Sequence, residues 1–252
     1  MTVVAPQLTI VVPAYQEGDA ILPGLLRILG AVETPAELLI VVDSADDSTV
    51  APVTALSATH PTVRVEVNEY GRGPANAIRY GIHQATAPIV VVTMADGCDD
   101  PRQIDDLARL VDRGVVVAAA SRYMPGGQQV GGGAFKTFLS RTAGRTLHVF
   151  AGIGTRDATN SFKAYRRSFV TEVGIQSRDG FEIGLELTAK AHRLRLPVAE
   201  IPTIWLDRTE GASSFKVLKW LPKYLHWYRF AFGRRLTLDQ LVAKSAAQGA
   251  TS

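Results

Sequence analysis

Hydrophobic positions in the first half of the chain alternate between unbroken runs and helical spacing. Short runs rich in β-branched residues predict strands at 8–13, 37–43, 63–67, 88–94 and 115–122, of which 8–13 and 37–43 are expected to be buried on both faces. Between these runs, apolar residues recur every three or four positions, which predicts helices over 19–32, 72–85 and 101–111. The alternation of strand and helix is typical of an α/β fold with a parallel sheet and right-handed crossovers.

The second half of the chain has a different pattern. Helical spacing predicts helices over 135–151 and 181–195, the segment 197–207 is extended, and 215–232 is aromatic and basic. Because there is no internal repeat and no long linker, we expect a single domain over 1–235. We divide it into halves at 8–123 and 124–235, and expect a C-terminal helix and tail over 236–252.

Composition narrows the class of protein. The chain has 252 residues, of which 20% are charged and 46% hydrophobic, as in an ordinary globular protein. The net charge of +3 is too small to argue for a nucleic-acid partner. A single cysteine, Cys98, excludes an intrachain disulfide and fits a reducing cytoplasm. No positive region precedes the first apolar run and no stretch of about 18 apolar residues exists, so we expect neither a signal peptide nor a membrane-spanning helix.

Polar residues gather where the expected strands end. In open α/β sheets, ligands bind beyond the carboxyl ends of the strands. The residues that follow the strands in turn are Pro13, Tyr15 and Glu17; Asp43, Asp46 and Asp47; Asn68 and Arg72; Asp96, Asp99 and Asp100; Ser121 and Arg122. An edge that collects carboxylates and a few arginines suits a divalent metal holding a diphosphate.

Competing cofactor motifs are missing from the sequence. There is no GxxxxGK[ST], which excludes a P-loop, and no GxSxG nucleophile elbow. The GRG at 71–73 is not GxGxxG, and it follows the third expected strand, whereas a dinucleotide fingerprint follows the first. The five histidines are scattered, without zinc-site spacing.

The motifs and their order resemble the family 2 glycosyltransferases. In the first half the likeness lies in LTIVVPAYQE (8–17), VVDSADDST (41–49), NEYGRGPANAIRYG (68–81), MADGCDDP (94–101) and SRY (121–123). In the second half, DATNSFKAYRR (157–167), DGFEIGLELTAKAHRLRLPVAEIP (179–202) and DRTEGASSFK (207–216) are similar to the dolichol- and polyprenyl-phosphate sugar synthase branch. The resemblance covers about residues 8–230. It implies a GT-A-like α/β fold, with a mixed, mainly parallel sheet, flanking helices and C-terminal amphipathic helices.

The resemblance also implies roles for individual residues. The first half would bind a nucleotide sugar with a UDP or GDP moiety, and the second would face the acceptor and the membrane. The implied nucleotide-sugar ligands are Pro13, Tyr15, Glu17, Asp43, Arg72, Asp96 and Arg122. Asp96 would be the metal carboxylate for Mg²⁺ or Mn²⁺, and Arg122 would neutralise the diphosphate. Arg208 and Lys216 would contact phosphate near the reaction centre.

Two positions depart from the family pattern. Met94 stands where the first Asp of the DxD motif is usual, so the metal site needs another ligand, for which Asp99 and Asp100 are the candidates. Ser214 stands where a basic residue usually follows Gly-x-Ser, and Lys216 is the candidate substitute.

The acceptor determines whether a base is needed. The resemblance implies inversion by direct displacement of a nucleoside diphosphate. A phosphate monoester is already anionic at neutral pH, whereas a sugar hydroxyl would need a base, for which Asp179, Glu182 and Glu186 are candidates. Cations in the second half favour a polyprenyl phosphate; they are Arg141, Lys163, Arg208 and Lys216. We therefore assign Lys163, Arg208 and Lys216 to the acceptor phosphate, and Asp96, Arg122, Arg208 and Glu182 to catalysis.

A membrane surface is the third expected partner. The aromatic and basic residues of 215–235, together with 135–150, suit the headgroup boundary, so we expect peripheral attachment at the cytoplasmic face of the cell membrane. Pro222 is expected to kink or break the helix there.

Structural roles remain open for these residues. The three aspartates at 96–100 could cap the helix that begins near Pro101, and Arg122 could form an internal ion pair. Glu182 or Glu186 could pair with Lys190, and the aromatic stretch could be buried packing or a dimer face. Three other functions also remain open: transfer to a hydroxyl of a saccharide or small molecule, a non-catalytic nucleotide-sugar binder or membrane scaffold, and a nucleotidyltransferase.

Overall fold

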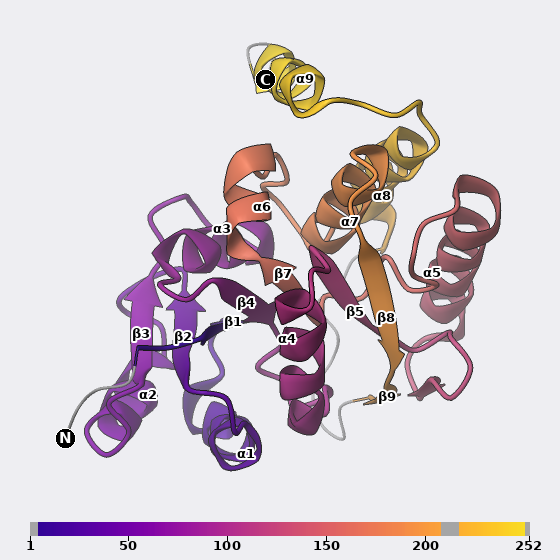
Figure 1. Cartoon of the computed structure of the whole chain (residues 1–252). Coiled ribbons are helices and arrows are strands. Elements are labelled where there is room, and N and C mark those ends of the chain that lie inside the picture. The colour runs from indigo at the N-terminus through magenta and orange to yellow at the C-terminus, as the bar shows by residue number, and fades with distance from the viewer. Residues whose placement is uncertain (1–4, 208–216, 250–252) are drawn as a thin grey trace.

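The computed structural model describes residues 5–207 and 217–249. Its centre is a seven-stranded sheet in the order β3-β2-β1-β4-β7-β5-β8 (Figure 1). The strands are β1 (Leu8–Pro13), β2 (Ala36–Val42), β3 (Val63–Val67), β4 (Ile89–Val92), β5 (Val117–Ser121), β7 (Lys163–Arg166) and β8 (Val198–Pro202). All neighbouring pairs are parallel except those of β7, which is antiparallel to both β4 and β5. The expected mixed, mainly parallel sheet is confirmed.

The antiparallel strand β7 determines which loops meet. In the register, Lys163 lies beside Val92 at the end of β4 and beside Ala119 of β5. The residues that precede β7 therefore lie at the edge where β4 and β5 end. Pattern alone did not predict β7, because its four residues follow a long irregular stretch.

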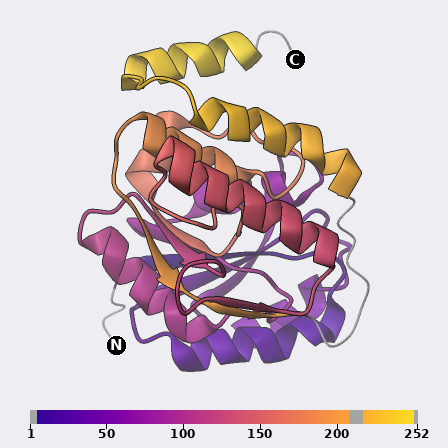
Figure 2. The ribbon, with the colours of Figure 1, turned by 90° about the vertical axis from the view of Figure 1, so that its right-hand side faces the viewer.

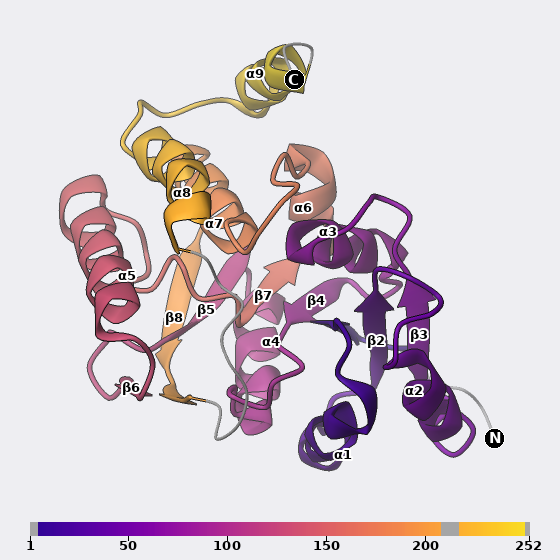
Figure 3. The same cartoon turned by 180° about the vertical axis from the view of Figure 1, so that it is seen from behind.

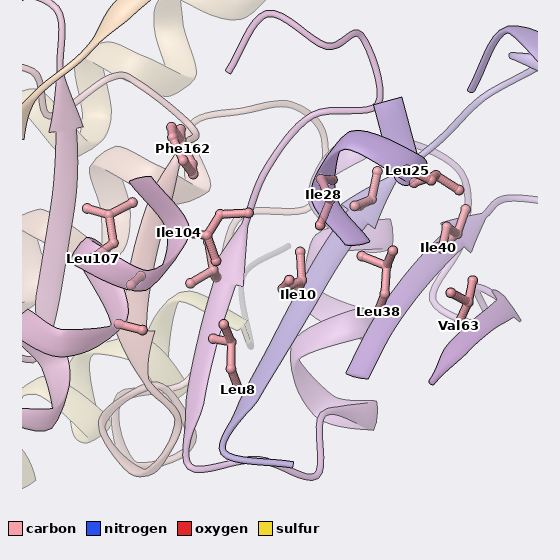
Figure 4. Close-up of a cluster of buried hydrophobic side chains, with 14 of the residues drawn as sticks. Leu8, Ile10, Leu25, Ile28, Leu38, Ile40, Val63, Ile104, Leu107 and Phe162 are labelled. Carbon is pink, nitrogen blue, oxygen red and sulfur yellow. The ribbon is translucent and has the colours of Figure 1, made fainter. Parts of the chain in front are cut away.

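One face of the sheet is covered by helices that follow β1, β2 and β4. These are α1 (Leu22–Ala31), α2 (Val50–Ser57) and α4 (Ile104–Asp112), preceded by the short helices η1 (Gly18–Ile21) and η2 (Pro101–Gln103). Because side chains alternate along a strand, alternate residues of β1 and β2 point to this face. Figure 4 shows the resulting core, in which Leu8, Ile10, Leu38 and Ile40 pack against the helices.

The other face is covered by α3 (Pro74–Gln84), α6 (Arg167–Val173) and α7 (Ile183–Arg193) (Figure 3). Val11, Leu39 and Val41, from the intervening strand positions, belong to its core. Helix α3 comes very close to the sheet at Gly81, where a Cβ would stand 2.5 Å from a methyl group of Val11. Both faces of the central strands are therefore buried, which explains their unbroken apolar runs.

A further layer lies beyond β5 and β8. It comprises α5 (Ala134–Thr146), a π-helical turn η3 (Leu147–Ala151) and α8 (Val217–Ala231), which run alongside one another in Figure 2. Strands β6 (Gln128–Val130) and β9 (Ile204–Leu206) form a small parallel ribbon, and α9 (Leu238–Gly249) packs against α6. Pro222 was expected to kink or break the helix; it lies inside α8, which continues through it, so the break does not occur.

Candidate functional site

One part of the predicted nucleotide site is centred on Asp43, after β2. One oxygen of its half-buried carboxylate accepts a hydrogen bond from Asn68 Nδ2 at 3.1 Å, and the other accepts one from the backbone N–H of Gly73 at 2.9 Å. Gly73 has a φ of 117°, a left-handed conformation that favours glycine. The turn that carries Arg72 is thereby tied to Asp43, and the Arg72 side chain is exposed beside it.

The loop after β1 is fastened to the loop after β2. The backbone N–H of Gln16 donates to both carboxylate oxygens of Asp47, and that of Glu17 donates to Thr49 Oγ1 at 3.1 Å. Pro13 is buried at the strand end, while the Tyr15 side chain is 67% exposed and Glu17 is half-buried. Tyr15 and Asp43 therefore lie on adjacent loops at one edge of the sheet, as expected from the order of the strands.

The three candidate metal carboxylates have different surroundings. Asp100 caps η2 and forms an ion pair with Arg102 at 2.8 Å, so the capping interpretation holds for this residue. Asp99 is buried and accepts hydrogen bonds from Thr93 Oγ1 and from the backbone N–H of Met94. Burial raises the pKa of Asp99 to about 7, and the charge of Asp96 adds to that rise. Asp96 is half-buried after β4, and its Oδ1 accepts a hydrogen bond from the backbone N–H of Cys98.

These residues restrict the kind of metal site that can form. Over residues 5–207 and 217–249, no group of three or more His, Cys, Asp or Glu residues is placed to hold a metal ion. Mg²⁺ commonly takes one or two protein carboxylates and completes its shell with substrate phosphates and water. The donor set fits an ion that arrives with a diphosphate and uses Asp96. It does not fit an ion held by Asp96, Asp99 and Asp100 together.

Arg122 forms a buried ion pair. Its guanidinium donates to both oxygens of Asp157 at 2.7 and 2.9 Å, and its backbone N–H donates to the same carboxylate at 3.0 Å. The Asp157 side chain is fully buried and that of Arg122 is 13% exposed. Burial by itself lowers the pKa of Arg122, but the pairing with Asp157 outweighs it and raises that pKa. Much of the charge expected to neutralise a diphosphate is therefore already paired.

Lys163 corrects an expectation from the sequence. Its side chain is fully buried at the start of β7, and its ammonium donates to the backbone carbonyls of Asp157, Ala158 and Asn160. Burial lowers the pKa of Lys163 to about 7. An ammonium enclosed in this way is not presented to an acceptor phosphate, and its hydrogen bonds stabilise the loop before β7.

Asp157 is the important residue that the sequence interpretation did not single out. It lies in the DATNSFK stretch, but nothing in the spacing showed that this loop would return to the end of β5. The antiparallel pairing of β7 brings it there.

The three candidate bases are all engaged or enclosed. Glu186 is fully buried, pairs with Lys190 at 2.5 Å, and accepts the backbone N–H groups of Gln176 and Ser177. Glu182 is 2% exposed, and burial raises its pKa. Asp179 forms an ion pair with Lys223 of α8. The expected pairing of Glu186 with Lys190 is present, and the assignment of Glu182 to catalysis is not supported by so enclosed a side chain.

Three residues assigned or discussed above lie outside the described residues. They are Arg208, Ser214 and Lys216. Their assignments to phosphate contact stay predictions.

Some aromatic side chains of the expected membrane surface are buried and others are exposed. Trp227 is 5% exposed, donates from Nε1 to Ser177 Oγ at 3.2 Å, and packs with Leu147 and Leu185. On α5 and η3, in contrast, Phe135, Phe138 and Phe150 are 61%, 65% and 75% exposed. No helix within the described residues is long and apolar enough to cross a bilayer.

Comparisons with known proteins agree with this architecture. The family model described as glycosyl transferase family 2 matches residues 9–174. A polyprenol monophosphomannose synthase from Mycolicibacterium smegmatis is 29% identical over 84% of this chain and 85% of its own. Dolichol-phosphate mannosyltransferases from Mycosarcoma maydis and Pyrococcus furiosus are 25% and 28% identical over 90% and 88% of this chain. The match covers 81% of the former and 63% of the latter.

Solved structures share the fold at low sequence identity. Glucosyl-3-phosphoglycerate synthase from Mycobacterium tuberculosis, in complex with Mn²⁺, UDP and glucosyl-3-phosphoglycerate, has a TM-score of 0.65 and 16% identity over 91% of this chain and 81% of its own. The mannosyltransferase PcManGT from Pyrobaculum calidifontis, in complex with GDP-Man and Mn²⁺, has a TM-score of 0.58 and 18% identity over 98% of this chain and 74% of its own. The strand order, the site at the strand ends and the match over 9–174 lead to one conclusion: the chain belongs to glycosyl transferase family 2 and has the GT-A-like fold.

Proposed function

We propose that this glycosyltransferase transfers a sugar from a nucleotide-sugar donor to a polyprenyl phosphate, with inversion at the anomeric carbon. The observation that carries the proposal is the similarity to polyprenol- and dolichol-phosphate mannose synthases over 84–90% of the chain. It extends beyond the family match at 9–174 into the second half, where an acceptor would bind.

The surroundings of the carboxylates support an acceptor that needs no base. A phosphate monoester is largely ionised at neutral pH and attacks as it stands, whereas a hydroxyl needs a nearby proton acceptor. Glu186 is paired with Lys190, Glu182 is enclosed, and Asp179 is paired with Lys223. These three candidates are therefore poorly placed to remove a proton, which favours the phosphate acceptor.

On the donor side, we propose that the nucleoside lies between the loops after β1 and β2. Asp43 is held in place by Asn68 and Gly73 and would accept hydrogen bonds from the nucleoside. Pro13 and Tyr15 would flank it, with Glu17 and Arg72 at the rim. Pre-formed hydrogen bonds fix the carboxylate before the donor arrives, which lowers the entropic cost of binding.

We propose that Asp96 holds Mg²⁺ or Mn²⁺ together with the donor diphosphate. Such an ion supplies Lewis-acid stabilisation of the charge that develops on the leaving diphosphate. Because Asp99 is buried and Asp100 is paired with Arg102, most of the remaining ligands would come from the diphosphate and water. Arg208 and Lys216 are proposed for phosphate contact on sequence grounds.

The lipid would approach along α5 and α8. Phe135 and Phe138 are exposed on α5, and the exposed Arg141 lies one turn further on, which suits an anionic headgroup boundary. Leu221 and Leu225 are exposed on the neighbouring α8. We therefore keep peripheral attachment to the cytoplasmic face of a membrane as part of the proposal.

A transfer assay with paired acceptors tests the proposal. Purified protein is incubated with radiolabelled GDP-mannose or UDP-glucose, Mn²⁺ or Mg²⁺, and undecaprenyl phosphate in detergent; undecaprenol without phosphate is the matched control. We expect label in the organic phase with the phosphate only, as a product cleaved by mild acid. Transfer to undecaprenol or free saccharides, with none to the phosphate, would refute the proposed acceptor.

A further inference from the structure

The loop before α7 contacts the nucleotide loop directly. The backbone carbonyl of Asp179 lies against Gly73, where a Cβ would stand 3.0 Å from the carbonyl oxygen. Gly73 in turn donates its N–H to Asp43. A segment of the second half therefore supports the turn that positions the proposed nucleoside ligand.

The same loop is held from its other side by α8. Gly180 lies under the ring of Trp220 so closely that a Cβ on Gly180 would overlap the ring. One turn along α8, Lys223 forms an ion pair with Asp179, and its ammonium lies 5.4 Å from the centroid of the Trp220 ring. Helix α8 itself is anchored to α7, against which it packs (Figure 3), and to Ser177 through Trp227.

These contacts form a continuous path from α8 to the donor site. Trp220 and Lys223 fix Asp179 and Gly180, the Asp179 carbonyl abuts Gly73, and Gly73 holds Asp43. The side chains of Leu221 and Leu225, on the same helix, are 42% and 37% exposed. The helix proposed to face the lipid is thus in contact with the loop that borders the nucleotide.

We propose that Trp220 and Lys223 are positioning residues for the nucleotide site, through which the acceptor-side helix α8 sets donor affinity. The inference rests on the proposed function, since it takes Asp43 as a donor ligand. Loss of the Lys223–Asp179 pair loosens the Gly73 turn and thereby lowers donor affinity, without requiring that Lys223 or Trp220 contact the nucleotide.

Calorimetric titration with GDP and UDP in the presence of Mn²⁺, without lipid, tests the inference on the full chain. Lys223→Met removes the ion pair, Lys223→Arg restores it, and Lys244→Met removes an exposed lysine from α9 as the matched control. Couplings between sites commonly change affinity by about fivefold or more. We expect Lys223→Met and Gly180→Ala to bind GDP or UDP about fivefold or more weakly than wild type. Lys223→Arg should recover the wild-type nucleotide affinity, and Lys244→Met should keep it.

Steady-state kinetics separates positioning from general destabilisation. The expected change is a higher KM for the donor with a nearly unchanged kcat, at unchanged urea midpoints for Lys223→Met. Wild-type affinity in both Lys223→Met and Gly180→Ala would overturn the inference while leaving the proposed function intact. Absence of nucleotide binding by the wild-type chain would overturn the proposed donor site and with it the inference.

Discussion

The Arg122–Asp157 pair gives a prediction that separates a structural role from a catalytic one. Replacing Arg122 with Met removes two hydrogen bonds, at 2.7 and 2.9 Å, from a carboxylate that is fully buried. Asp157 then keeps only the backbone N–H of residue 122 and a long contact of 3.4 Å from Thr159 Oγ1. A buried carboxylate is left without its direct ion pair, and the nearby ammonium of Lys163 compensates its charge only in part.

The expected cost follows from that geometry. Breaking a buried pair by removing one partner destabilises a protein by about 3–5 kcal/mol, because the other charge stays desolvated. Asp157→Asn should cost less, since the 13% exposed Arg122 side chain can turn toward solvent. In the double variant, Arg122→Met with Asp157→Asn, the buried charge is gone. We therefore expect its loss in free energy of unfolding to be smaller than the sum of the two single-variant losses by about 2 kcal/mol.

Urea unfolding followed by tryptophan fluorescence gives the three free energies, and calorimetry with GDP or UDP and Mn²⁺ gives the nucleotide affinity of each variant. Arg122→Lys is the milder control, since it keeps the charge but not the two-pronged geometry. The reasoning would be refuted by an Arg122→Met variant that unfolds within about 1 kcal/mol of wild type but loses more than about tenfold in affinity. That result would assign the guanidinium to the diphosphate.

Two further predictions concern the end of β4. Restoring a carboxylate by Met94→Asp should allow the protein to bind Mn²⁺ without nucleotide at least about tenfold more tightly than wild type does. Electron paramagnetic resonance of the free ion measures this binding. Equal Mn²⁺ affinity in Met94→Asp and in wild type would contradict the proposed role of Asp96. Asp99 has its pKa raised to about 7 by burial, so its folded form holds a proton that the unfolded chain has lost, and wild-type stability falls as pH rises toward 7. Relative to wild type, the free energy of unfolding of Asp99→Asn should rise by about 1.4 kcal/mol per pH unit between pH 5 and 7 and stay constant above pH 7. Urea unfolding measures this free energy for both proteins. A stability difference between them that is independent of pH would contradict the raised pKa of Asp99.

Much of the first half could be predicted because the strands that give its apolar pattern are also the strands that end at the proposed ligand site. Strands buried on both faces give unbroken apolar runs, and ligands bind where such strands end. The runs at 8–13 and 37–43 therefore located both the sheet and the loops that carry Tyr15 and Asp43. The resemblance supplied the family and the GT-A-like fold, which the family match and the structural neighbours confirm.

The second half was harder to predict because its side chains have partners remote in sequence. The alternation of the first half suggested a purely parallel sheet, and only the resemblance supplied the mixed one; β7 itself was not expected. Lys163 was assigned to a phosphate because cations in the second half suit an anionic acceptor, yet β7 carries it into the interior. Trp227 belonged to an apparent membrane stretch, but its ring fills the space between α7 and η3.

Residue type alone cannot distinguish the two uses of a charge in this fold. An arginine at the end of a strand can bind a diphosphate or a buried aspartate, and the choice depends on whether an aspartate reaches it. Here an antiparallel strand brings Asp157 to Arg122, and a C-terminal helix brings Lys223 to Asp179. The first pairing reduces the charge available to the donor, and the second connects the donor loop to α8. Strand register and helix packing therefore decide which of the predicted residues remain available for chemistry.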